Sequence, residues 1–431
     1  SVMNRYFQLV IVSLSLILLL AVGCSDRGTN APDTPKEQLV EQWGVWPEGD
    51  HVFTEDPNDP NSPVQLRFQI RNRNGIQEMG VFIPQEAINE GKRVPLLVLL
   101  PPMFEGKSFY LDHGLLELAE EMTASGEIQP MVITALGSDQ LFGGYFWGNS
   151  HPAGFYDGII ADPHPNGLVG WLTNTIPFII DSPAKRGIGG VGMGAYGAFR
   201  AILKHPGVYS SISVSDGPLD FDGAGGNSGM INLFDDALAE QGLAPTDFQL
   251  LDSARAWPVS SMMIGGALAF SPNDTAVFYT ISISGAGGGT RDTVIIDSVH
   301  QRSDSTTLDT LVVKGDMGNW DFHLPFDSTL QPYAPIWSLW MENNLDSIHD
   351  ADTSTLGSPL DGINMWIATT PDARFGFYDM TQSWISTLQD RGYTPEVYNY
   401  GGYDGKPASE NEYTYDLIRE MLIFHSENFG D

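Results

Sequence analysis

The feature that most restricts the fold of this sequence is a series of short apolar runs alternating with segments of helical spacing. Residues 94–100 and 131–135 are almost wholly apolar, as expected for strands buried on both faces of a parallel sheet. Further strands are predicted at 187–191 and 211–215, and helices at 115–125, 167–180 and 195–204. Because strands and helices alternate, right-handed crossovers and a mostly parallel central sheet flanked by helices follow.

Three other regions complete this α/β prediction. Alternating apolar residues at 66–70 and 79–83, separated by Asn74-Gly75, predict an antiparallel hairpin at the start. Residues 275–316 are β-rich and contain a glycine run, so we interpret them as an inserted hairpin or small sheet. The αβ pattern then resumes, with strands predicted at 363–369 and 396–400 and helices at 380–390 and 413–425.

The first residues indicate export. Arg5 precedes an apolar run that is too short to span a bilayer, so residues 1–23 are interpreted as a signal peptide. Leu20-Ala21-Val22-Gly23-Cys24 resembles a bacterial lipobox, which implies acylation of Cys24 and, with Ser25 after it, sorting to the outer membrane. Cys24 is the only cysteine, so no intramolecular disulfide can form. Residues 24–62, rich in Pro, Asp and Asn, are predicted to be a tether.

Composition narrows the possible partners. The 431 residues are long for one compact domain and short for three, so we expect one enlarged domain over 63–431. They include 21 basic and 54 acidic residues, a net charge of −33, with no basic patch. Such a surface repels nucleic acid and anionic lipids, which leaves the lipid anchor as the only expected membrane contact. The sequence does not identify a protein partner.

A glycine-rich turn is the main functional motif. Gly190-Val191-Gly192-Met193-Gly194 has the spacing of a G-x-S-x-G nucleophile elbow, a sharp turn from strand to helix. Together with Lys204-His205-Pro206 and Asp216-Gly217-Pro218, it resembles the esterase family that includes S-formylglutathione hydrolases, feruloyl esterases and mycolyltransferases. The resemblance spans roughly residues 65–425 apart from the insertion. It implies an α/β-hydrolase fold and a Ser–Asp–His triad without a cofactor.

Matching that triad residue by residue shows a degenerate site. Gly192 occupies the position of the nucleophile, whereas Asp372 matches the acid. The loop that should carry the histidine has Tyr403 and Asp404 in its place. The oxyanion loop begins with Pro101-Pro102, which have no N–H to donate, so the remaining candidate donors are the amides of Met103, Phe104 and Met193. Loss of the serine or histidine of a triad lowers the rate by about 10⁶.

Two hypotheses therefore stay open. In the first, the domain is non-catalytic and binds an ester-like or carbohydrate ligand, or a partner, at the cell envelope. In the second, it is an active carboxylic-ester hydrolase with a displaced nucleophile such as Ser108, Ser213 or Ser215. An aromatic cluster is predicted to line a cleft, and its members include Tyr145, Phe146, Trp147 and Trp337. A metal site at Asp157, Asp162 and His164 is disfavoured, because Asp-Pro-His-Pro-Asn-Gly is typical of a turn.

Overall fold

The computed structural model describes residues 52–54, 64–72, 75–106, 108–137, 146–150, 154–155, 160–161, 167–223, 229–241, 258–271, 283–284, 290–291, 312–313, 322–326, 331–401 and 410–430. The predicted signal peptide, Cys24 and most of the tether therefore lie outside the described residues.

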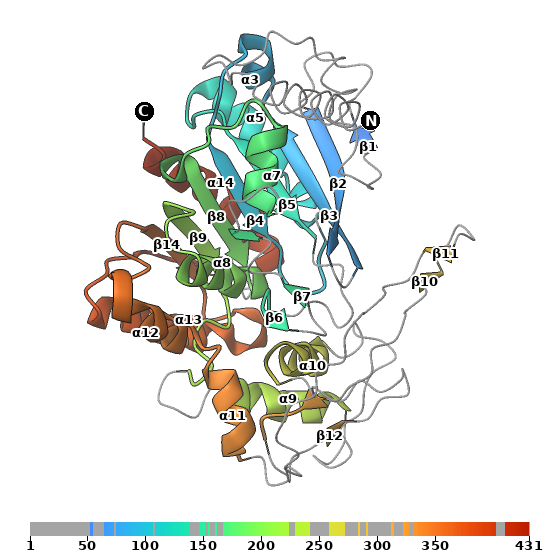
Figure 1. The fold of residues 1–431 in the computed structure, drawn as a ribbon, viewed down its shortest axis with the longest axis vertical. Helices are drawn as coiled ribbons and strands as arrows, with labels where there is room; N and C mark the ends of the chain where they lie inside the picture. The colour runs from blue at the N-terminus through green and yellow to red at the C-terminus, as the bar shows by residue number, and fades with distance from the viewer. Residues whose placement is uncertain are drawn as a thin grey trace, which may run out of the picture.

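A nine-stranded sheet forms the centre of the molecule (Figure 1). In spatial order its strands are β1 (Val52–Thr54), β2 (Val64–Asn72), β3 (Gly75–Ile83), β5 (Val132–Leu136), β4 (Leu96–Leu100), β8 (Arg186–Val191), β9 (Ser211–Ser215), β14 (Asn364–Thr369) and β15 (Glu396–Asn399). The pairings from β1 to β5 are antiparallel, and every pairing from β5 to β15 is parallel. The predicted mostly parallel sheet is thus confirmed, as is the antiparallel hairpin at its start.

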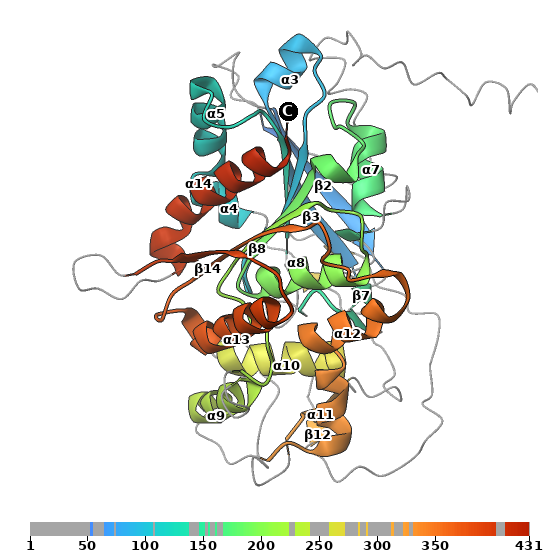
Figure 2. The same cartoon turned by 90° about the vertical axis from the view of Figure 1, so that its left-hand side faces the viewer.

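Helices cover both faces of this sheet (Figure 2). On one face lie α4 (Ser108–Asp112), α5 (Leu115–Ser125) and α14 (Glu410–Asn428), and on the other α7 (Leu168–Thr175), α8 (Met193–Lys204), α12 (Leu345–Leu356) and α13 (Phe377–Asp390). The buried residues accordingly form two apolar clusters, one on each side of the strands. A short helix, α3 (Gln85–Glu90), precedes β4.

Three helices that the sequence patterns did not reveal lie together beyond the carboxyl ends of the strands. They are α9 (Met230–Gln241), α10 (Pro258–Phe270) and α11 (Ala334–Met341) (Figures 1 and 2). Helix α10 was missed because it is apolar all round, and every one of its residues from Val259 to Phe270 is buried. The Trp340 ring of α11 packs on Gly266 of α10, and its indole N–H donates to the Ser271 hydroxyl at 2.9 Å.

Two sequence predictions need comment. The helix predicted at 167–180 ends at Thr175, because Pro177 disfavours helical backbone at the preceding residue. Within the predicted insertion 275–316, β10 (Ile283–Ser284) pairs antiparallel with β11 (Thr290–Arg291). In addition, β12 (Val312–Val313) pairs with β13 (Phe322–His323). Neither pair belongs to the central sheet, and the rest of the segment lies outside the described residues.

Helix α14 lies unusually close to the sheet because strand β8 is built from glycines. A Cβ at Gly187 would come within 2.4 Å of the His425 ring, and one at Gly189 within 2.8 Å of the Met421 methyl group. His425 is fully buried, and the hydroxyls of Ser211 and Ser213 on β9 lie 2.8 Å from its two ring nitrogens. Burial lowers the pKa of His425 to about 3, so the folded protein holds this ring neutral.

Among the described residues, no helix combines the length and the apolar composition that crossing a membrane requires.

Candidate functional site

Gly192 lies at the sharp turn between β8 and α8, where the motif places it. Its backbone has φ 57° and ψ −119°, a conformation that glycine adopts far more readily than other residues. The Gly192 N–H donates to the Ser215 carbonyl at 2.8 Å, and the Gly192 carbonyl accepts from the Ala195 N–H at 3.0 Å. The turn is therefore anchored both to the neighbouring strand β9 and to the first turn of its own helix.

The two flanking glycines of the motif are sterically required. A Cβ at Gly190 would lie 2.2 Å from the Gly194 carbonyl oxygen, and a Cβ at Gly194 would lie 2.1 Å from the Leu100 carbonyl oxygen. Both obstacles are backbone atoms, which cannot swing aside as a side chain can. The close contact between α8 and strands β8 and β4 thus fixes the elbow independently of residue 192.

The space above Gly192 is bounded by the oxyanion loop. A Cβ at residue 192 would meet the Pro102 side chain at 3.4 Å, which is ordinary van der Waals contact. Pro102 begins a turn in which its carbonyl accepts the Glu105 N–H at 3.3 Å. Met103 is buried in this turn, while Phe104 is partly exposed and has a positive φ of 67°. Helix α8 has no side-chain cap, so the amide of Met193 at its start is still a candidate donor.

A buried carboxyl group, Asp216, lies beside the elbow and was missed as a site residue. It directly follows β9, and its carbonyl oxygen is 4.0 Å from the place of a Cβ on Gly192. Its side chain is fully buried and accepts hydrogen bonds from the Tyr400 hydroxyl, the Ser215 hydroxyl (3.0 Å) and the Thr370 N–H (3.0 Å). The sequence signal was an acidic residue at the carboxyl end of the strand next to the motif.

Burial changes the pKa of the Asp216 carboxyl group. Desolvation raises the pKa of its carboxyl group to about 6, and the hydrogen bonds from Tyr400, Thr370 and Ser215 partly oppose that rise. Tyr400 follows β15, and the loop after this strand holds the predicted histidine position. The Tyr400 phenol thus occupies one acceptor site of the only carboxyl group that the described structure buries beside the elbow.

The other predicted triad positions are placed as follows. Asp372 follows β14 and is exposed, and its N–H donates to the Thr370 hydroxyl at 3.3 Å. Tyr403 and Asp404 lie outside the described residues. Asp372, the predicted acid, therefore lies at the same edge of the sheet as Gly192. The predicted histidine position lies outside the described residues.

Two of the aromatic residues that were predicted to line a cleft, Phe146 and Trp147, lie within the core. Phe146 and Trp147 are 1% and 3% exposed, and the Trp147 ring packs on Gly197 of α8. Phe146 packs against Tyr196 and Phe270, and its N–H donates to the Met193 sulfur. Trp337 is partly buried and contacts Phe326, and Tyr145 lies outside the described residues.

The alternative serines do not form a displaced nucleophile site in the described structure. Ser213 and Ser215 are fully buried on β9, where Ser213 contacts His425 and Ser215 donates to Asp216. Ser108 begins α4 and is exposed. No group of three or more His, Cys, Asp or Glu side chains in this part of the chain is placed to hold a metal ion. Asp157, Asp162 and His164 lie outside it.

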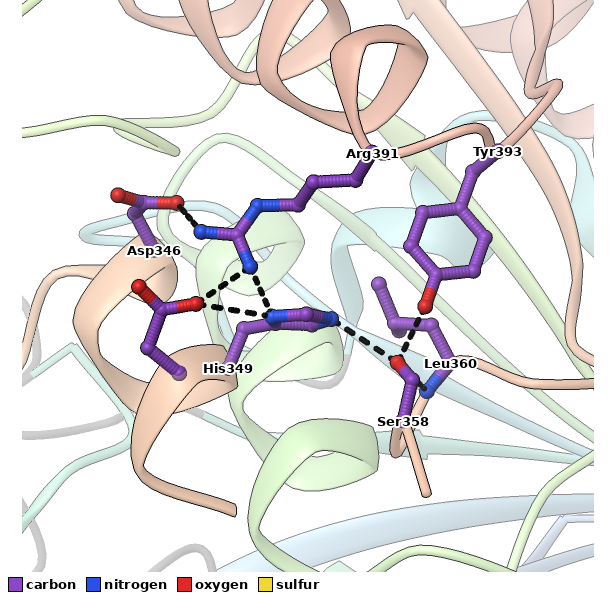
Figure 3. A network of polar contacts seen from close by, with 7 residues as sticks. Asp346, His349, Ser358, Leu360, Arg391 and Tyr393 are labelled. Atoms are coloured by element: carbon purple, nitrogen blue, oxygen red, sulfur yellow. Dashed lines mark hydrogen bonds and ion pairs between the residues drawn. The ribbon is translucent and has the colours of Figure 1, made fainter. Parts of the chain in front are cut away.

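A second set of Ser, His and Asp side chains lies near the starts of β14 and β15 (Figure 3). The Ser358 hydroxyl is 2.9 Å from His349 Nε2, and Asp350 Oδ1 is 3.4 Å from His349 Nδ1. This is the order of groups in a hydrolytic triad. Arg391, however, contacts the same Nδ1 atom and also pairs with Asp346 and Asp350.

The Arg391 contact bears on the proton positions in this network. A guanidinium can only donate, so this contact favours an accepting Nδ1 and a proton on Nε2 of His349, whereas the longer Asp350 contact would need the proton on Nδ1. In the arrangement that the Arg391 contact favours, His349 donates a hydrogen bond to Ser358. The Ser358 hydroxyl is also contacted by the Tyr393 hydroxyl and accepts the Leu360 N–H. We conclude that the network fastens α12 to the segments before β14 and β15.

Comparison with known proteins found similarity to solved structures. No model of a known protein family matches this chain, and no curated protein matches it. Solved structures that are similar include a ferulic acid esterase, with 12% identity, 89% of this chain and 99% of the other covered, and a TM-score of 0.49. An S-formylglutathione hydrolase from Agrobacterium tumefaciens has 11% identity, coverages of 86% and 98%, and a TM-score of 0.46. One from Staphylococcus aureus has 12% identity, coverages of 88% and 98%, and a TM-score of 0.43.

The strand order, the elbow between β8 and α8, and the acidic residues after β9 and β14 establish the fold of this chain. It is an α/β-hydrolase fold, with glycine at the sharp turn between β8 and α8.

The elbow geometry predicts two different responses to alanine among its three glycines. Gly190→Ala and Gly194→Ala force a Cβ against backbone oxygens, so each should lower the free energy of unfolding by more than about 3 kcal/mol or prevent folding. Gly192→Ala meets only van der Waals contact and should lower it by about 1–3 kcal/mol, through its positive φ. Urea unfolding followed by circular dichroism measures all three. Equal losses for the three variants would contradict this account of the elbow.

Asp216 predicts a pH-dependent loss of stability. Because its folded pKa is raised, its contribution is complete below the unfolded value of 3.8 and is lost as pH rises through about 6. Asp216→Asn removes this titration, and asparagine tolerates the positive φ of this position. Relative to wild type, the variant should gain about 2 kcal/mol of unfolding free energy between pH 4.5 and pH 8.

Denaturant unfolding of both proteins at the two pH values tests this expectation. Asp372→Asn, which removes an exposed carboxylate at the same edge of the sheet, is the matched control. A gain of the same size in the control, or none in Asp216→Asn, would refute the assignment.

Proposed function

We propose that this protein is an exported, lipid-anchored protein whose esterase-like domain binds a ligand or a partner at the cell envelope without acyl transfer. The observation that carries the proposal is Gly192, which has no side chain at the elbow, beneath the Pro102 side chain. An acyl-enzyme cannot form on glycine. The surrounding elbow is nevertheless retained. Gly190 and Gly194 pack against backbone atoms, and Asp216 forms its buried hydrogen bonds.

In the described part of the chain, no histidine atom is among the three atoms nearest to a Cβ on Gly192. His425 contacts two serines of β9, His349 contacts Arg391, and His113 contacts the Phe109 carbonyl. The buried Asp216 carboxyl group is already occupied by Tyr400, Ser215 and Thr370. A serine restored at 192 would therefore find the nearby Asp216 carboxyl group already hydrogen-bonded, which supports a binding role over a catalytic one.

The alternative function is a carboxylic-ester hydrolase with a displaced nucleophile. It requires an accessible serine with a base within hydrogen-bond reach. Ser213 and Ser215 are fully buried, and the His349 ring beside Ser358 is also contacted by Arg391. The described structure therefore gives Ser213, Ser215 and Ser358 no support as nucleophiles.

Covalent labelling separates the two functions. We expect no labelling of the full chain by a fluorophosphonate probe and no hydrolysis of p-nitrophenyl acetate above a heat-denatured sample. Gly192→Ser should also stay unlabelled, because the base is missing as well as the nucleophile. Ser358→Ala is the control for the second Ser–His–Asp set. Labelling of the wild type at any serine, mapped by mass spectrometry, would overturn the non-catalytic proposal, and its loss in Ser358→Ala would identify that network as the site.

The anchor is tested separately by changing the predicted lipobox. In a bacterial host fed labelled palmitate, the wild-type chain should incorporate the label and fractionate with the outer membrane. Cys24→Ala should lose both the label and the membrane association, since Cys24 is the only cysteine. Ser25→Asp should keep the label but move the protein to the inner membrane. Labelled Cys24→Ala protein would exclude lipidation at this residue.

A further inference from the structure

His425 is a buried titratable side chain that takes no part in the elbow around Gly192. It lies on α14 and is 0% exposed. The hydroxyls of Ser211 and Ser213 lie 2.8 Å from its two ring nitrogens, and the Phe429 ring stacks on it at 5.7 Å. Among the described residues, its hydrogen-bond partners are therefore neutral hydroxyl groups, and no carboxylate pairs with the ring.

The space for this ring is formed by the sheet. A Cβ on Gly187 would lie 2.4 Å from His425 Nδ1 and 2.7 Å from its Cε1 atom, so glycine is needed there to leave room for the imidazole. A neutral imidazole satisfies both serine hydroxyls, because one nitrogen donates a hydrogen bond and the other accepts one. Aliphatic side chains would fill a helix–sheet interface without any polar partner. The arrangement therefore fits a neutral imidazole, a group whose charge depends on pH.

A charge on this ring has no compensation while the helix is docked on the sheet. Burial alone lowers the pKa of His425 from 6.5 to about 3. In a released helix the ring is solvated and has its ordinary pKa, so the released state binds more protons than the docked state. Docking of α14 is therefore strongest above pH 6.5 and weakens as the pH falls toward 3. Its equilibrium constant falls by about tenfold for each pH unit in this interval.

The charged side chains near α14 do not contact His425. Strands β9 and β14 contain none, and Arg186 at the start of β8 pairs with Asp181. The described charged side chains of α14 and of the neighbouring helix α5 are exposed or half-exposed, and they are Glu117, Glu120, Glu121, Asp416, Arg419, Glu420 and Glu427. Since none of these described groups hydrogen-bonds with His425, the response to pH comes from its burial.

We propose that α14 is a pH-sensitive element of the fold, which leaves the sheet when His425 is protonated while the strands stay paired. All nine strands of the central sheet precede α14 in the chain, so its release does not interrupt the chain between paired strands. Release uncovers apolar residues on this face of the sheet, among them Leu97, Leu99 and Trp366. The proposal goes beyond ligand binding at the elbow and does not depend on it.

Asp216 responds to acid in the opposite direction. The pKa of its carboxyl group is raised to about 6, so a fall in pH favours the folded arrangement in which Asp216 contacts Tyr400 and Thr370. The same fall in pH weakens the docking of α14 and strengthens the strand ends beside the elbow. Acid should therefore separate the helix from the sheet before the sheet itself unfolds.

Hydrogen exchange of the full chain at pH 7 and pH 4.5, corrected for intrinsic rates and followed by mass spectrometry, tests the proposal. The protection factors of α14 amides should fall by about 70-fold between the two pH values. Those of β4 and β5 should fall by less than about tenfold, because the strands stay paired.

His425→Gln supplies a neutral donor and acceptor at both pH values, so its α14 protection should change by less than about threefold. His205→Gln is the matched control, because His205 ends α8 on the opposite face of the sheet and is half-buried. It should respond like the wild type.

Unchanged protection of α14 in the wild type would overturn the proposal, and so would an equal loss in α14, β4 and β5, which indicates global unfolding. A full loss that persists in His425→Gln would also refute it. If that variant fails to fold, nuclear magnetic resonance of the wild-type imidazole decides the matter. A His425 ring that titrates near pH 6.5 while α14 stays protected contradicts the proposal, whereas protonation that accompanies loss of α14 protection supports it.

Discussion

The close contact of backbones around strand β8 is the constraint on which the rest of the structure depends. Gly190 and Gly194 allow α8 to lie against the carbonyl of Leu100, and Gly187 allows α14 to lie against the opposite face. Side chains at these positions would separate the layers by more than packing can repair. The elbow is thus a consequence of how the layers meet, and it does not depend on a side chain at residue 192.

This dependence explains how the elbow is kept with glycine at position 192. The glycines at 190 and 194 contribute to stability through packing, whereas a serine at 192 would contribute chemistry and some strain. The buried Asp216 carboxyl group has the opposite balance. It is stabilised by three neighbours, yet burial raises its pKa to about 6, so its ionised form makes the fold less stable.

The two sets of serine and histidine side chains show why proximity alone does not define a catalytic group. Ser213 is within hydrogen-bond distance of His425 but is sealed under α14, and Ser358 is within reach of His349, whose acceptor nitrogen is held by Arg391. Burial keeps a substrate from reaching Ser213. At Ser358, the Arg391 contact with Nδ1 of His349 favours a proton on the nitrogen that faces the serine. Both sets fasten helices to the sheet.

The sequence by itself determined the alternation of strands and helices, the initial hairpin, and the glycine at the elbow, because these depend on local periodicity and on a short motif. It did not reveal α10, whose uniformly apolar surface has no helical period, or the burial of Phe146 and Trp147, which depends on helices distant in the chain. Only the tertiary structure placed Asp216 beside Gly192 and Tyr400 against Asp216. Those contacts join residues up to 184 positions apart, and burial there, which no local pattern encodes, sets the pKa of the carboxyl group.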